Sequence, residues 1–165
     1  MGSNCAVRFT AVAVTVIAGV SLTLGCSSST PARQGTVAER GARVMPFDLD
    51  ATTHTFTDAR DGGIERVTAD EPSDAKQIRL IRGHLRREAK RFSRGDFADP
   101  ARVHGMNMPG VDELRKNYDR VNVAYAAQPS GAQITYTTVD PKLVAAIHRW
   151  FDRQLADHGD DAQRG

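Results

Sequence analysis

Residues 121–136, VNVAYAAQPSGAQITY, contain the clearest structural pattern in the chain. Apolar residues at every second position predict strands that each bury one face, and a Pro-Ser-Gly sequence between two such runs predicts a turn. This stretch therefore predicts a β-hairpin. Its alternating apolar residues are Val121, Val123 and Tyr125 before the turn, and Ile134 and Tyr136 after it.

A helix is predicted directly after this hairpin. Asp140 is a typical N-cap, because its side chain accepts hydrogen bonds from backbone N–H groups that the first helical turn leaves unpaired, and Pro141 suits the first turn. Gly159 is the expected stop. Apolar residues recur between them at spacings of three and four, which predicts one buried stripe: Leu143, Val144, Ile147, Trp150, Phe151 and Leu155.

The same order occurs earlier in the chain. Residues 53–57 have the Thr and aromatic content of a strand, residues 61–63 supply turn glycines, and residues 64–69 return as the partner strand. Asp74 and Gln77 have the spacing of a capping box. The helix that follows is expected to stop at Gly95, and its apolar stripe is Ile78, Ile81, Leu85, Ala89 and Phe92.

These elements predict one α+β domain over residues 47–162. Its order is ββαββα, with a four-stranded antiparallel sheet and both main helices on one face. Aligning Ile78 with Val144 brings the two stripes into register, which indicates an internal duplication, although any two amphipathic helices can be aligned in this way. Residues 96–110 are predicted to form a long loop, followed by a helix-like stretch at residues 111–118. Long ordered loops often carry function.

The N-terminal segment has the features of a lipoprotein signal peptide. Arg8 is followed by an uncharged run that extends to Gly25, and the sequence Leu-Thr-Leu-Gly-Cys ending at Cys26 resembles a bacterial lipobox, with Thr23 in place of the usual aliphatic residue. We expect residues 1–25 to be removed, Cys26 to carry acyl chains such as palmitate, and residues 26–46 to form a disordered tether. An uncleaved membrane anchor is the alternative.

Composition narrows the possible chemistry. The chain has 165 residues and a formal net charge of +2, which is too small to indicate a nucleic-acid partner. Its two cysteines are Cys5, within the predicted signal peptide, and Cys26, which would carry lipid. The mature domain would therefore have no thiol for a disulfide, a zinc cluster or a nucleophile.

The histidines are the main candidates for a site. His104 lies near Met106 and Met108, and imidazole with thioether groups suits copper, zinc or another transition metal. The alternative is that both methionines fill gaps in the core. A further alternative is a hydrolytic enzyme that uses His104 with a carboxylate of the same segment, Asp96 or Asp99.

The first long helix has a strongly basic surface. Arg86, Arg87 and Arg91 are its central cations, and outside a membrane they could contact anionic lipid headgroups or an envelope partner. The alternative is a solvated face whose charges pair with acids elsewhere in the domain.

A resemblance adds to this interpretation. Residues 84–97, 104–110 and 146–159 resemble a group of small exported actinobacterial proteins of unknown function, over about residues 53–162. Some members are named aspartate carbamoyltransferase. Enzymes with that activity use a Ser-Thr-Arg-Thr phosphate loop and a His-Pro-x-Gln segment, and neither sequence occurs here, so we predict no transcarbamoylase activity.

Together these features predict a membrane-anchored lipoprotein on the extracytoplasmic face of the cell envelope. We expect a binding or accessory domain rather than an enzyme, because the sequence has no Gly-x-Ser-x-Gly elbow, P-loop or dinucleotide fingerprint. A small hydrolytic enzyme and a structural partner of an envelope protein are the two alternatives.

Overall fold

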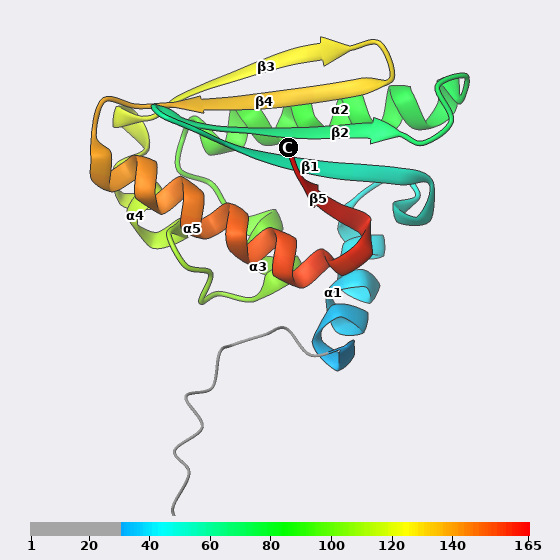
Figure 1. Cartoon of the computed structure of the whole chain (residues 1–165), viewed down its shortest axis with the longest axis horizontal. Coiled ribbons are helices and arrows are strands. Elements are labelled where there is room, and N and C mark those ends of the chain that lie inside the picture. The colour runs from blue at the N-terminus through cyan, green and yellow to red at the C-terminus, as the bar shows by residue number, and fades with distance from the viewer. Residues whose placement is uncertain (1–30) are drawn as a thin grey trace, which may run out of the picture.

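The computed structural model describes residues 31–165, which form an α+β domain with one five-stranded sheet and five α-helices (Figure 1). The predicted signal peptide and Cys26 lie outside the described residues. In chain order the helices and strands are α1 (Pro31–Val44), β1 (Thr52–Ala59), β2 (Gly62–Ala69), α2 (Ala75–Phe92), α3 (Ala98–His104), α4 (Val111–Lys116), β3 (Asn122–Gln128), β4 (Gly131–Thr137), α5 (Pro141–His158) and β5 (Ala162–Arg164). Single 3₁₀ turns are η1 (Leu49–Ala51), η2 (Tyr118–Arg120) and η3 (Gly159–Asp161).

The sheet has the order β3-β4-β2-β1-β5. Both predicted hairpins are present, and they join through antiparallel pairing of β2 with β4. The predicted four-stranded antiparallel sheet is nevertheless wrong, because β5 adds a fifth strand that runs parallel to β1 and pairs Ala162 with His54. Three mostly polar residues are too few for alternation to identify a strand.

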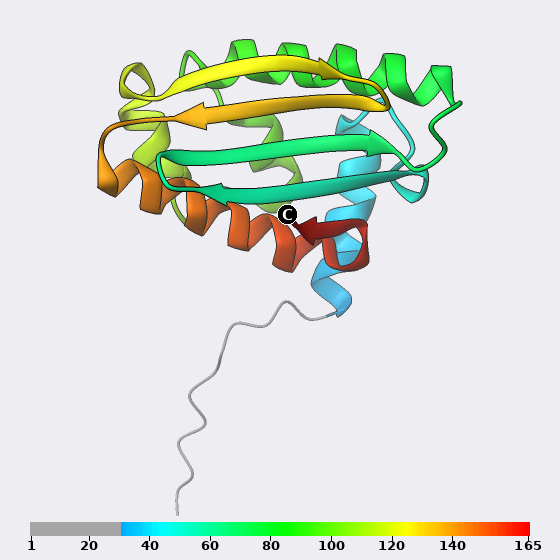
Figure 2. The same cartoon turned by 45° about the horizontal axis from the view of Figure 1, so that its top comes forward.

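Both long helices cover the same face of the sheet, as predicted (Figures 1 and 2). Tyr136 on β4 contacts Phe92 of α2 at 6.3 Å and Phe151 of α5 at 5.9 Å between ring centroids. Because strand side chains alternate between faces, one tyrosine can touch both helices only if they lie on one side. The internal duplication stays a prediction.

The helix caps follow the sequence pattern closely. Asp74 accepts hydrogen bonds from the backbone N–H groups of Lys76 and Gln77, and Asp140 accepts one from Lys142. The capping-box pairing is wrong in one detail, since the Gln77 side chain accepts a hydrogen bond from the backbone N–H of Asp48 at 3.1 Å.

The predicted tether is folded from residue 31 onward. Pro31–Val44 is a helix, although only Val37 and Gly41 on it are buried. Polar contacts hold it in place, because Arg33 binds Asp157 on α5 through two hydrogen bonds of 2.7 and 2.9 Å. A helix held mainly by polar contacts has no apolar stripe to reveal it.

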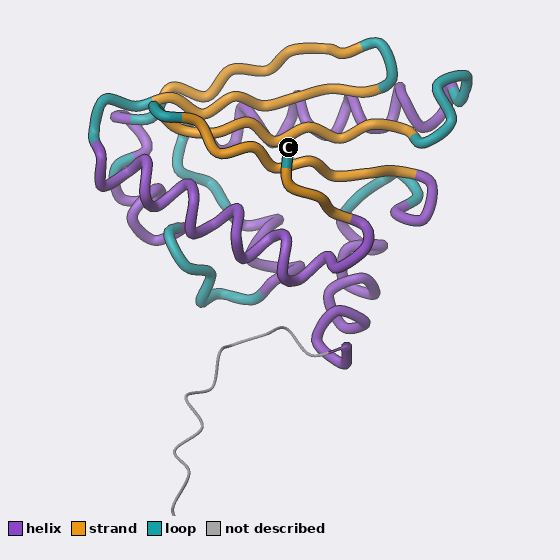
Figure 3. Tube along the Cα trace, in the orientation of Figure 1, coloured by secondary structure: helices purple, strands orange, loops and turns teal. Residues whose placement is uncertain are grey.

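The predicted long loop is also partly helical (Figure 3). Ala98–His104 forms α3, which packs against α1. Val111–Lys116 forms α4 within the stretch predicted as helix-like, and packs against α5. The segment that joins α2 to β3 is therefore ordered and partly helical.

Candidate functional site

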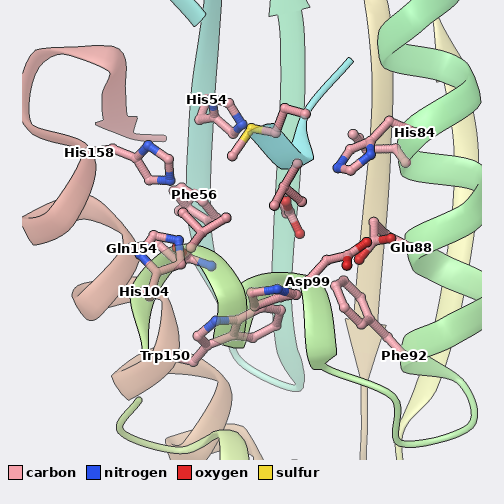
Figure 4. A pocket seen from close by; sticks show the side chains of 16 residues that line it. His54, Phe56, His84, Glu88, Phe92, Asp99, His104, Trp150, Gln154 and His158 are labelled. Carbon is pink, nitrogen blue, oxygen red and sulfur yellow. The ribbon is translucent and has the colours of Figure 1, made fainter. Parts of the chain in front are cut away.

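A partly enclosed cavity of about 50 Å³ lies between the sheet and the helices α2, α3 and α5 (Figure 4). Aromatic side chains form part of its wall, namely Phe56, Phe92 and Trp150. The rest of the wall is unusually polar for a protein interior. It contains histidines, carboxylates and an amide that come from five different elements, β1, β2, α2, α3 and α5.

Four of the five histidines meet at this cavity. They are His54 on β1, His84 on α2, His104 at the end of α3 and His158 at the end of α5. The rings of His54 and His158 stack at a centroid distance of 5.0 Å, and His104 meets His158 edge-on at 5.1 Å. His148 lies elsewhere, and its Nε2 contacts the carbonyl oxygens of Ala59 and Gly62.

Burial keeps three of these histidines, His54, His84 and His158, in their neutral form. It lowers the pKa of His54 to about 4, with the charges of His84 and His104 adding to the effect. Burial also lowers the pKa of His84 to about 4, with Arg87 contributing, and it lowers the pKa of His158 well below its usual value. At neutral pH these rings are therefore uncharged groups that can each donate and accept a hydrogen bond.

Two carboxyl groups of the cavity, Glu65 and Glu88, have pKa values shifted in the opposite direction. Burial, followed by the negative charge of Asp99, raises the pKa of Glu88 to about 8, although Arg91 opposes the shift. Burial raises the pKa of Glu65 to about 7 against the hydrogen bond that Tyr136 donates to it at 2.9 Å. Glu88 is therefore mostly protonated at neutral pH and Glu65 is partly so.

Four buried polar atoms around this cavity have no hydrogen-bonding partner within the protein. They are His54 Nδ1, Glu88 Oε2, Trp150 Nε1 and Gln154 Oε1. The hydroxyl of Tyr125, outside the cavity, is the one other such atom among residues 31–165. Because each unpaired buried group costs about 1–3 kcal/mol, their concentration around one space indicates a binding site.

His104 is oriented by a carboxylate on one edge of the cavity. Its Nδ1 lies 3.0 Å from Oδ2 of Asp157, which also binds Arg33 and Arg153. Burial alone would raise the pKa of Asp157, but hydrogen bonds from His104 and Arg33 hold it below its usual range. An ionised carboxylate at Nδ1 favours the tautomer whose Nε2 is free to accept a proton.

The carboxylates predicted to assist His104 do not pair with it, although Asp99 lines the same cavity. Asp96 and Asp99 both bind Arg91, and Asp99 also binds Arg102. The carboxylate that pairs with the ring of His104 is that of Asp157, not that of Asp96 or Asp99.

The predicted metal ligands do not line a common space. His104 faces the central cavity, whereas Met106 and Met108 line a separate surface pocket of about 370 Å³ near α4. Met106 is 70% exposed and Met108 is buried in the core. Within residues 31–165 no group of three or more His, Cys, Asp or Glu residues is arranged to hold a metal ion. Copper or zinc binding stays a prediction that this arrangement does not support.

The basic residues of α2 divide into two kinds. Arg86 and Arg87 are exposed, and the Arg86 guanidinium lies 5.0 Å from the ring centroid of Tyr125. Arg91 is instead bound by Asp96 and Asp99 and is not a free surface cation. Contact with an anionic surface stays a prediction, and it concerns Arg86 and Arg87.

Sequence reasoning missed Glu65, Glu88, Gln154 and Asp157. A usable signal existed for three of them, because Glu88 follows Leu85 by three residues, and Gln154 and Asp157 follow Trp150 by four and seven. These polar residues therefore stand within an apolar stripe. Glu65 had no comparable local signal.

No protein family, curated protein or solved structure matches this chain in the comparisons made. Membership in the group of exported actinobacterial proteins therefore stays a prediction. Among residues 31–165, no helix is both long and apolar enough to cross a bilayer. The geometry of the cavity is consequently the main guide to function.

The opposing pKa shifts predict a stability maximum near pH 6.5. Below that pH the histidines bind protons in the unfolded chain but stay neutral in the folded protein. The free energy of unfolding therefore falls as pH falls toward 4. Above it, unfolding releases protons that Glu65 and Glu88 hold in the folded state, so stability falls as pH rises toward 8. Between pH 6.5 and 8 the two glutamates are expected to remove about 2 kcal/mol of stability, of which the histidines, still partly protonated in the unfolded chain, offset about half, and urea unfolding measures the net loss.

Substitution of Glu88 tests the cause of this loss. Glu88→Gln is expected to remove most of the net loss above pH 6.5, because only Glu65 would still release a proton and the histidines would offset it. Glu39→Gln makes the same change at an exposed position of α1 and should leave the profile unaltered. A wild-type profile that is flat from pH 6.5 to 8 would contradict the raised pKa values.

Proposed function

We propose that this protein is an extracytoplasmic, membrane-anchored binding domain whose central cavity takes a small polar ligand. The observation that carries the ligand site is the set of four unpartnered polar atoms around one cavity, contributed by His54, Glu88, Trp150 and Gln154. A ligand that pairs with these groups would recover hydrogen-bond energy that the empty fold forgoes.

The size of the cavity limits the ligand. A cavity of about 150 Å³ accommodates benzene, so the 50 Å³ found here suits a group of only a few heavy atoms. The ligand is therefore a very small molecule, or the head group of a longer one. A longer ligand would extend past Val44 and Met45, which line the cavity at the C-terminal end of α1.

The position of the cavity agrees with the proposed duplication. The alignment that pairs Ile78 with Val144 also pairs three cavity residues of α2 with three of α5: His84 with Trp150, Glu88 with Gln154 and Phe92 with His158. A pair of duplicated helices that diverged at their facing positions would place a binding site between them.

A hydrolytic enzyme is the second candidate, and the pairing of His104 with Asp157 favours it. A histidine held by a carboxylate at 3.0 Å can act as a general base through its other nitrogen, and a protonated Glu88 in the same cavity could donate a proton. The cavity-lining residues include no Ser, Thr or Cys, so attack would require a water molecule.

Trp150 provides a direct assay of binding. It is the one tryptophan in the chain, so its unpartnered indole N–H gives a single, assignable NMR signal from inside the cavity. In the full-length chain we expect this signal to shift saturably with at least one of methylammonium, acetamide and acetate, with Kd below about 10 mM, equivalent to about 3 kcal/mol. Gln154→Met should weaken the binding at least about fivefold, whereas Gln163→Met, an exposed control, should not.

The same samples separate the two candidates. If the wild-type protein converts acetamide to acetate and the His104→Gln variant does not, the result would favour the enzyme over the binding domain. Absence of any shift with all three probes would contradict a ligand site in this cavity.

Membrane anchorage has its own test. We expect mass spectrometry of the membrane fraction to find acyl chains on residue 26, and Cys26→Ser to release the protein from that fraction. Exposed Arg86 and Arg87 would then add attraction to anionic lipid. Recovery of the protein in the cytosol with its first 25 residues intact would contradict both anchorage and export.

A further inference from the structure

The cavity contains carboxyl groups that the protein's own cations do not neutralise. Asp99 binds Arg91 and Arg102, and Arg91 also binds Asp96 at 2.9 Å. The same Arg91 guanidinium comes only within 3.7 Å of Glu88. Arg91 is therefore shared among Glu88 and the two aspartates, and its single charge does not balance all three carboxyl groups.

Among residues 31–165, Glu88 has no cationic partner besides Arg91, and Glu65 has none. Glu88 is 5% exposed and its Oε2 accepts no hydrogen bond within the protein. Glu65 receives a hydrogen bond from the neutral hydroxyl of Tyr136. Of the described residues that line the cavity, none is Lys or Arg.

Aromatic rings complete the surroundings of these carboxyl groups. Phe92 and Trp150 line the same cavity as Glu88, and Figure 4 shows them below the adjacent carboxyl groups of Glu88 and Asp99. The electron-rich faces of aromatic rings attract cations, most strongly when water is excluded. Carboxylates and aromatic rings around a small space are a typical setting for an organic cation.

We infer that the ligand is a small organic cation whose ammonium group enters the cavity and donates a hydrogen bond to the unpartnered Oε2 of Glu88. This inference rests on the proposed function and adds the chemical class of the ligand. The limited volume admits a methylammonium-sized group, either free or at the end of a longer amine.

Other ligand classes fit less well. A metal ion would need ring nitrogens that converge, but His54 and His158 stack with their planes 14° apart, and no group of three suitable ligands exists within residues 31–165. An anion would face Glu65, Glu88 and Asp99 across a cavity without a permanent positive charge. A neutral amide could pair with Gln154, but it would leave the carboxyl groups without a counter-ion.

The raised pKa values of Glu88 and Glu65 agree with a missing counter-ion. A bound ammonium group would lower both, so binding releases protons, and the apparent affinity should rise about tenfold per pH unit between pH 6 and 8. Ionisable groups that also face or influence Glu88 are Arg91 and His84 on α2, Asp99 on α3, Glu65 on β2 and Tyr136 on β4.

The experiment measures binding of methylammonium, acetamide and acetate to the full-length chain by calorimetry and by the Trp150 indole signal. We expect methylammonium to bind at least about tenfold more tightly than acetamide, a difference of about 1.4 kcal/mol, and acetate not to bind. Glu88→Gln should remove this preference, whereas Glu39→Gln on exposed α1 should keep it.

Proton release provides a readout that does not need a variant. Methylammonium binding at pH 7 should release close to one proton, seen as a dependence of the binding heat on the ionisation enthalpy of the buffer, whereas acetamide should release none. If acetamide binds as tightly as methylammonium, or no proton is released, the ligand class is wrong while the binding function stands. If no probe binds, both are wrong.

Discussion

Glu88 is held inside the protein with one carboxyl oxygen unpaired, and much of the structure follows from this constraint. It lies on the inner side of α2, between Leu85 and Phe92, which pack into the core. The helix cannot turn Glu88 toward water without exposing those apolar neighbours. The carboxyl group therefore stays protonated at neutral pH, and it keeps a polar space open where close packing would otherwise be expected.

Asp157 links this space to the N-terminal helix. Its carboxylate binds Arg33 of α1, Arg153 of α5 and His104 of α3, so three helices meet at one buried charge. Arg33 also donates to the backbone carbonyl of His104 at 3.0 Å. Through this network α1, the first element that the structure describes after the predicted anchor, is attached directly to a wall of the cavity.

The sequence predicts those parts of the fold whose cause is local. Alternating residues such as Val123 and Tyr125 specify the hairpins, and Asp74 and Asp140 begin the two long helices at the predicted positions. Two of the elements that it does not predict, α1 and β5, are stabilised by distant partners. Arg33 needs Asp157, and Ala162 needs His54 on β1. Neither contact leaves a periodic pattern in its own segment.

The same distinction explains the site. The histidines stand out by residue type, but their meeting depends on how α2, α3, α5 and β1 pack. The cluster expected from sequence proximity, His104 with Met106 and Met108, is separated because Gly105 ends α3 and the chain leaves the cavity there. Polar residues within apolar stripes, such as Glu88 and Gln154, are better indicators than neighbours in sequence.

A pH titration of the side-chain carboxyl carbons of glutamate, followed by ¹³C NMR on the ligand-free, full-length chain, tests the central claim most directly. The account predicts that Glu88 titrates near pH 8 and Glu65 near pH 7, because both carboxyl groups lose water inside the fold and no cation fully balances them. Titration of both groups near the ordinary glutamate value of 4.5 would contradict it, since the cavity would then already satisfy its charges.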